Sequence, residues 1–169
     1  MDGDKDTPRL DEVASSVDAR HGVIKFYDPT AAFGWLSTFS NHPITLDGIQ
    51  WPTVEHFFQA AKFPRSQYRT LIKEAHWPAD AKDLAAEWRA VRRPDWNMVE
   101  EQVMQRALIA KFEQHPELLE LLIATNPDLL IEDANDDEYW GCGQDGKGQN
   151  RLGKLLMIVR AEMIERTVR

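Results

Sequence analysis

The clearest pattern of apolar and polar positions lies in residues 51–63, where two stripes follow a helical period. The apolar stripe, spaced i, i+3, i+4 and i+7, consists of Val54, Phe57, Phe58 and Ala61. The polar stripe beside it consists of Glu55, Gln59 and Lys62. Thr53 is a suitable N-cap, and Pro52 would end the preceding segment. The pattern predicts a helix that packs on a core and holds a carboxylate, an amide and an amine in line.

The rest of the chain divides into short extended runs and longer helical patterns. Strands are predicted at 22–27, 44–46, 49–51 and 129–131, and an extended segment at 33–39. Asp47-Gly48 predicts a hairpin between the second and third of these strands. Helices are predicted at 68–76, 79–88, from Pro94-Asp-Trp96 to a break at Gln114-His-Pro116, at 116–124, and at 151–167 with Asn150 as its cap.

These elements predict one α+β domain, in which a small early strand cluster with a hairpin is surrounded by helices. The domain is expected to span residues 21–169. Residues 1–20 are polar and rich in Asp and Ser, so they are expected to form a disordered tail.

Charge and composition narrow the class of function. The formal net charge is −8, which argues against a protein that coats nucleic acid by bulk electrostatics, although a local basic site is compatible with it. The single cysteine and the scattered histidines predict no disulfide, no metal site and no cofactor. Because no apolar run approaches membrane-spanning length, an intracellular protein, cytoplasmic or nuclear, is expected.

A second candidate site precedes the last predicted helix. Four glycines, Gly141, Gly143, Gly146 and Gly148, stand near Lys147 and Arg151, in a setting that could seat an anion. The segment matches GxxxxGK, but Gly148 stands where a P-loop needs Ser or Thr. Two interpretations of this segment remain: a phosphate-binding loop of another kind, or a glycine-rich turn that binds no ligand. For Glu55 and Lys62, likewise, surface positions beside an ordinary core face are the simpler alternative.

Taken together, these segments resemble the YbiA-like family, also called NADAR. The resemblance rests on Trp51-Pro-Thr-Val-Glu-His-Phe-Phe-Gln-Ala-Ala-Lys-Phe63, Glu101–Leu108 with Lys111-Phe112, Asp137-Glu-Tyr-Trp-Gly141, and Gly146-Lys-Gly-Gln-Asn-Arg-Leu-Gly153, and runs from about Ile24 to Ile164. The chain departs from the family pattern in two places. Thr38 stands where the family usually has Asn, and Ala85-Ala86 replaces a common Gly-Arg, so that Arg92 or Arg93 would have to replace that arginine.

The resemblance implies an N-glycosidase that cleaves a bond between ribose C1′ and an exocyclic amine. Two substrates are implied: ADP-ribosylated guanine in nucleic acid, which we favour, and the phosphoribosylamine intermediates of riboflavin synthesis. The catalytic residues implied are Glu55, Lys62 and Asp137. The substrate contacts implied are Trp35, Ser37, Thr38, Gln59, Trp140, Gly146, Lys147, Gly148, Asn150 and Arg151.

In this hypothesis Lys62 forms a transient Schiff base, Glu55 shuttles protons and Asp137 orients the ribose or acts as a second acid or base. Trp35 and Trp140 stack on the base or wall the ribose, and the glycine-rich segment seats phosphate. Water activated by Glu55 is the competing mechanism. A catalytically silent ADP-ribose reader and an interaction domain with an exposed apolar face on the helix from Trp96 to Phe112 are the competing functions.

Overall fold

The computed structural model describes residues 22–168, so the predicted tail lies outside the described residues. Within that range the fold is α+β, as predicted. Its elements are β1 (Val23–Phe26), the 3₁₀ helix η1 (Gly34–Leu36), β2 (Ile44–Leu46), β3 (Ile49–Trp51), α2 (Val54–Ala60), α3 (Ser66–Lys73), α4 (Pro78–Glu87), η2 (Arg89–Val91), α5 (Trp96–Gln114), α6 (Pro116–Ala124), β4 (Leu129–Glu132) and α7 (Arg151–Val168). No helix in this range is both long and apolar enough to cross a membrane.

The described strands form two separate pairs. β2 and β3 make the predicted hairpin, in which Asp47 and Gly48 adopt φ angles of 54° and 73°, the left-handed values that such a turn needs. β1 instead pairs in parallel with β4, with Val23 opposite Leu129, although more than a hundred residues separate them. This pairing brings the end of β4, and the loop after it, next to the early part of the chain.

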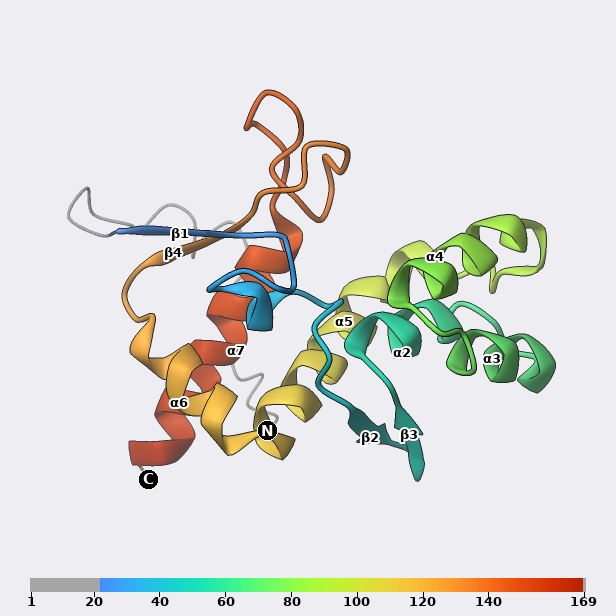
Figure 1. Cartoon of the computed structure of the whole chain (residues 1–169), viewed down its shortest axis with the longest axis horizontal. Helices are drawn as coiled ribbons and strands as arrows, with labels where there is room; N and C mark the ends of the chain where they lie inside the picture. The colour runs from blue at the N-terminus through green and yellow to red at the C-terminus, as the bar shows by residue number, and fades with distance from the viewer. Residues whose placement is uncertain (1–21, 169) are drawn as a thin grey trace, which may run out of the picture.

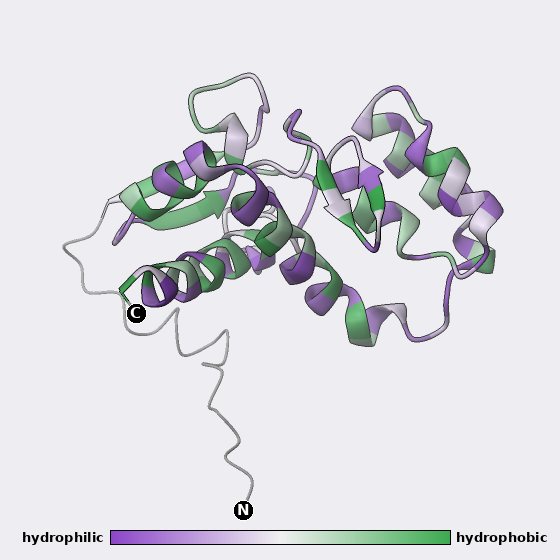
Figure 2. Ribbon diagram, turned by 90° about the horizontal axis from the view of Figure 1, so that it is seen from below, coloured by the Kyte–Doolittle hydropathy of each residue, from purple (hydrophilic) through white to green (hydrophobic). Residues whose placement is uncertain are grey.

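Helix α5 is the centre of the arrangement. It contacts α2 and β2 on one side and α6 and α7 on the other, and Figure 1 shows it crossing between these two groups of elements. In Figure 2 the helices carry both hydrophobic and hydrophilic patches, as expected for elements that turn one face to a shared core. Fully buried side chains of that core include Trp51, Trp96, Phe112 and Leu130.

Two details differ from the predictions. Residues 33–39 are not extended: they contain η1 and a series of turns, because Gly34 lies so close to the backbone of Pro29 that an added Cβ would stand 2.3 Å from its carbonyl oxygen. The predicted helix of residues 51–63 is shorter, since α2 ends at Ala60 and Lys62 lies in the turn that follows. The Thr53 cap is confirmed, with its hydroxyl accepting from His56 N at 3.3 Å.

Candidate active site

A pocket of about 230 Å³ lies where α2 meets the segment after β4. It is lined by Thr38, Phe39, Glu55, Phe58, Gln59, Lys62, Lys82, Met104, Glu132, Asp137, Trp140 and Leu152. These residues come from seven regions of the chain: the loop before β2, α2 with the turn that follows it, α4, α5, the end of β4, the loop after β4, and α7. The pocket thus unites the polar stripe of α2 with the acidic segment that precedes the glycine-rich loop.

Glu55 is held firmly on the first turn of α2. Its side chain is buried, with the residue 6% exposed, and both carboxylate oxygens accept hydrogen bonds. Thr38 Oγ1 donates to Oε2 at 2.8 Å, and Gln59 Nε2 donates to Oε1 at 2.6 Å. The oxygen of the same Gln59 amide is buried without a partner among the described residues, so it is an open acceptor for a substrate hydroxyl or amine. The alternative of a surface Glu55 is therefore wrong.

A buried lysine supports the loop that carries Thr38. Lys111, on α5, is 1% exposed, and its Nζ donates to the carbonyls of Trp35 and Ser37 and to the hydroxyl of Ser40. These contacts use all three donors of an ammonium group. Because Thr38 lies between two of these partners, Lys111 fixes the position from which Thr38 reaches α2.

Lys62 lies at the wall of the pocket, in the turn after α2. Its Nζ is 5.4 Å from the ring centroid of Phe58 and 5.6 Å from that of Trp96. Burial lowers the pKa of the amine below its ordinary value, and this effect outweighs the opposing attraction of Glu55. A lowered pKa increases the fraction of neutral amine, which is the nucleophilic form.

Asp137 and Trp140 approach the pocket from the loop after β4. Asp137 Oδ1 accepts from the backbone N–H groups of Tyr139 at 2.9 Å and Trp140 at 2.8 Å, which locks the turn. The Trp140 ring packs edge-on against Phe58, with ring centroids 5.4 Å apart. The second carboxylate oxygen of Asp137 has no hydrogen bond among those described, so the turn leaves it available to a ligand.

Two charged residues of the pocket were missed from the sequence. Glu132 ends β4, and Lys82 lies on α4, one turn before the Ala85-Ala86 departure. Period-two alternation from the apolar Leu130 could have flagged Glu132 as facing the interior. The arginines expected to replace the family's Gly-Arg do not line the pocket: Arg93 pairs with Asp95 at 2.6 Å, and Arg92 donates to Asn97 at 3.4 Å.

Other predicted substrate contacts lie outside the pocket lining: Trp35, Ser37, Gly146, Lys147, Gly148, Asn150 and Arg151. Trp35 packs edge-on against Phe112, and the Ser37 hydroxyl accepts from Phe39 N. Arg151 Nε donates to Glu101 at 2.5 Å.

Lys147 and Gly146 are exposed, whereas Gly148 is packed so tightly that an added Cβ would lie 2.5 Å from the Cys142 backbone. Asn150 does not cap α7 with its side chain, which instead bonds to the backbone of Leu130 and Glu132 in β4. The structure thus accounts for Gly148 and Asn150 by packing and hydrogen bonding within the protein. Their contact with phosphate stays a prediction.

A second, larger hollow of about 600 Å³ adjoins the pocket through Phe39, which lines both. Its other lining residues are Pro29, Thr30, Asn41, Pro52, Thr53, His56, His76, Trp77, Pro78 and Ala79. The surface is mainly apolar, and Trp77 is 62% exposed. An exposed indole at the rim of an apolar groove is suited to stacking on a flat ring.

Comparisons with known proteins identify the family of the chain. The NADAR domain family matches residues 25–164, and the chain therefore belongs to the NADAR family. The chain is 46% identical over 141 residues to N-glycosidase YbiA of Escherichia coli, covering 83% of this chain and 88% of that protein. It is 39% identical to an N-glycosidase of Nostoc punctiforme, covering 83% of this chain and 92% of the relative.

Two further comparisons bear on fold and substrate. The NMR structure of the E. coli protein YbiA matches with a TM-score of 0.81 at 44% identity, covering 87% of this chain and 88% of that one. A riboflavin biosynthesis protein of Vibrio vulnificus is 37% identical over 142 residues, which are 84% of this chain but 39% of that longer protein.

Proposed function

We propose that this chain releases ADP-ribose from ADP-ribosylated guanine in nucleic acid by hydrolysing the bond between ribose C1′ and the exocyclic amine. The chain is a hydrolase of N-glycosyl bonds, in keeping with its family and with the N-glycosidase names of its relatives. One observation carries the assignment of the site. Glu55, Lys62 and Asp137, from segments about 80 residues apart in the sequence, line one small pocket.

The chemistry proposed for Lys62 follows from the nature of the bond. The C1′ carbon carries both the ring oxygen and the exocyclic nitrogen, so protonation of the ring oxygen allows the ring to open to an imine. The neutral amine of Lys62 then adds to C1′, the guanine amine leaves, and water hydrolyses the resulting Schiff base. The lowered pKa of Lys62 and its contacts with Phe58 and Trp96 support this role.

Glu55 is the proposed proton carrier between these amines. Two hydrogen bonds, from Thr38 and Gln59, fix its carboxylate on the same helix that leads to Lys62. Because this fixed carboxylate lines the same pocket as Lys62, it is positioned to take up a proton from the attacking amine and to deliver it to the leaving amine. Direct attack by water activated by Glu55 is the competing mechanism, and it predicts no covalent adduct.

The two hollows support a substrate larger than a sugar phosphate. The pocket, at about 230 Å³, is smaller than the 300–1,000 Å³ of typical small-molecule sites, which suits a ribose unit. The adjoining groove with Trp77 could hold a nucleobase, and Lys82 offers a cation for phosphate. The alternative substrate, a riboflavin intermediate, is supported by the name of the Vibrio relative. It would require only the smaller pocket.

Side-by-side turnover assays test the proposal. The purified protein is incubated with an ADP-ribosylated guanine oligonucleotide and, separately, with the phosphoribosylamine intermediates, and released base and sugar are measured. We expect release from the oligonucleotide at the higher kcat/KM. Turnover of the riboflavin intermediates alone would overturn the substrate assignment. Binding of free ADP-ribose without turnover of either substrate would favour a silent reader.

A matched variant separates the two substrates through the groove. Trp77→Ala should lower kcat/KM for the oligonucleotide by about 5- to 100-fold, the loss of one stacked base, and leave the smaller intermediates unaffected. Leu71→Ala, which removes an exposed apolar side chain on α3 away from the groove, is the control.

The interaction-domain alternative lacks its predicted surface, because the apolar residues of α5 are mostly buried and only Met98 is strongly exposed.

A further inference from the structure

Two pocket residues have a buried polar atom without a hydrogen-bond partner in the described part of the chain. Among the described residues, three buried side-chain atoms lack a hydrogen-bond partner: Trp51 Nε1, Gln59 Oε1 and Glu132 Oε2. The last two belong to pocket residues. Because such atoms are rare and cost free energy, a buried carboxyl oxygen with no partner on a cavity wall indicates a group that is completed by a ligand.

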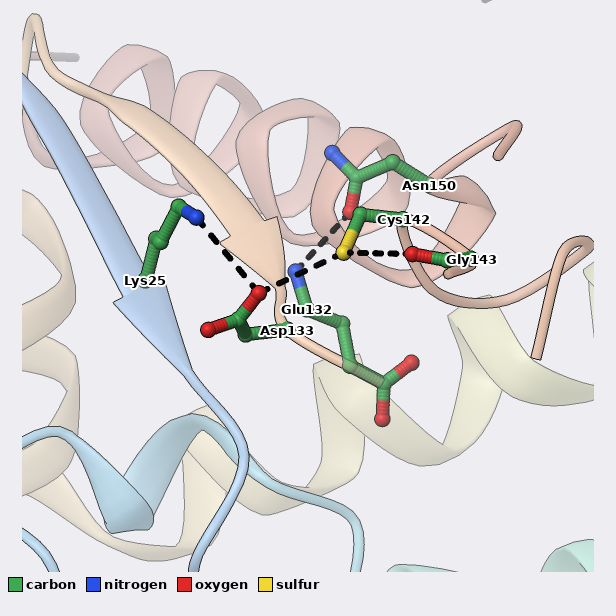
Figure 3. Close-up of polar contacts among 6 residues, drawn as sticks. All are labelled: Lys25, Glu132, Asp133, Cys142, Gly143 and Asn150. Carbon is green, nitrogen blue, oxygen red and sulfur yellow. Dashed lines mark hydrogen bonds and ion pairs between the residues drawn. The ribbon is translucent and has the colours of Figure 1, made fainter. Parts of the chain in front are cut away.

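The fold sets the direction of the Glu132 side chain. At the end of β4 the side chains alternate, so Asp133 turns towards Lys25 and Cys142 while Glu132 turns the other way (Figure 3). The backbone N–H of Glu132 donates to Asn150 Oδ1 at 2.9 Å, which ties this end of the strand to the start of α7. Figure 3 shows the carboxyl group pointing away from these contacts, with no interaction to the other labelled residues.

The surroundings of Glu132 differ from those of Glu55. The charged groups that act on Glu132 are Asp137, Glu55, Lys82 and Asp136. Burial, with the nearby carboxylates of Asp137 and Glu55, raises the pKa of Glu132 to about 8, and Lys82 opposes this only in part. The two carboxyl groups of the pocket thus differ in their hydrogen-bond partners: Glu55 accepts two hydrogen bonds, whereas Glu132 has one oxygen to which no described group donates.

We infer that Glu132 is a further catalytic residue, the acid that protonates the ribose ring oxygen and so opens the ring. The inference rests on the proposed function. In this step the Glu132 proton passes to O4′, the C1′–O4′ bond breaks, and the exocyclic nitrogen lone pair forms the C1′=N bond. Glu132 becomes a carboxylate, and it recovers the proton when O4′ closes again on C1′ after the base has left. Lys62 attacks only the open form.

The test compares Glu132→Gln with Glu120→Gln, a matched change at an exposed position on α6. Glutamine keeps the size of the side chain but cannot deliver the proton. We expect kcat on the preferred substrate to fall about 100- to 10,000-fold in Glu132→Gln, with KM within about threefold, and no change in Glu120→Gln. The wild-type fall in kcat at alkaline pH should be absent from the residual activity of Glu132→Gln. Unchanged kcat in this variant would overturn the inference.

A trapping experiment distinguishes proton donation from a structural role. Glyceraldehyde 3-phosphate has an open-chain aldehyde and needs no ring opening, whereas free ADP-ribose does. With borohydride present, Glu132→Gln should form the Lys62 adduct with the aldehyde at the wild-type rate and lose adduct formation with ADP-ribose. Loss of both adducts would refute the acid role. If the wild type turns over no N-glycoside at all, both the proposed function and this inference are refuted. An active wild type matched by an active Glu132→Gln variant refutes the inference alone.

Discussion

The buried amine of Lys111 offers a quantitative test of how the fold holds the pocket. Its Nζ donates to Trp35 O at 2.5 Å, to Ser37 O at 3.0 Å and to Ser40 Oγ at 2.7 Å. The loop formed by these partners also carries Thr38. Lys111→Met keeps an unbranched side chain of similar length and removes all three donors. The oxygen atoms of the loop would then remain buried without the amine.

The size of the effect follows from these contacts. Leaving a buried acceptor unsatisfied costs about 1–3 kcal/mol, and at least two carbonyl groups are affected. Part of this loss in the free energy of unfolding is offset, because the substitution also removes the cost of burying the ammonium group, the same burial that lowers the pKa of Lys111 to about 7. We expect the free energy of unfolding to fall by about 3 kcal/mol, which for a domain of this size lowers Tm by about 6–12 °C.

Urea denaturation of the wild type, Lys111→Met and the control Lys73→Met measures this loss. Lys73 is exposed at the end of α3, so its substitution should change stability by less than about 0.5 kcal/mol. The pH dependence has a defined sign. The folded pKa of Lys111 lies below its unfolded value, so the wild type should gain stability relative to Lys111→Met as pH rises from 7 towards 10.5. A loss below about 1 kcal/mol at pH 7 would refute this account of the loop.

Three further predictions concern the pocket and its frame. Thr38→Val removes the hydrogen bond to Glu55 and should lower kcat about tenfold, whereas Thr38→Ser, assayed beside it, should stay near wild type. Glu132 has a folded pKa above its unfolded value, so it stabilises the protein below pH 4.5 and this stability is lost as pH rises to about 8. Denaturation at pH 8 should therefore find Glu132→Gln more stable than the wild type, with the difference vanishing near pH 4. Gly153→Ala places a Cβ 2.1 Å from Leu130 O, so thermal unfolding should show a loss of about 1–3 kcal/mol; an unchanged Tm would contradict this packing.

Local signals predicted most of the fold. The Asp47-Gly48 turn, the Thr53 cap, Pro94 just before α5 and Pro116 at the start of α6 each act over a few residues, so the sequence pattern is enough to place those elements. The extended segment at 33–39 was wrong, because its geometry depends on a close approach of Gly34 to Pro29 and on the distant Lys111. Neither contact leaves a periodic trace in the sequence.

The site was predictable where one short element carries it. Glu55 and Gln59 are one helical turn apart, so their proximity follows from the helix alone. Glu132 was missed because β4 pairs with β1, more than a hundred residues away, and only this pairing turns the strand end towards α2. The side chain of Asn150 was expected at the helix start, but its amide supplies the donor and acceptor that the backbone of β4 requires.

Trapping of the proposed covalent intermediate tests the central claim most directly. The wild type, Lys62→Ala and the control Lys73→Ala are each incubated with an ADP-ribosylated guanine oligonucleotide and borohydride, and the modified peptide is identified by mass spectrometry. We predict one reduced sugar adduct on Lys62, present in the wild type and Lys73→Ala, together with loss of base release in a folded Lys62→Ala protein. Full base release by Lys62→Ala, or turnover by the wild type without any adduct on Lys62, would contradict the proposed mechanism.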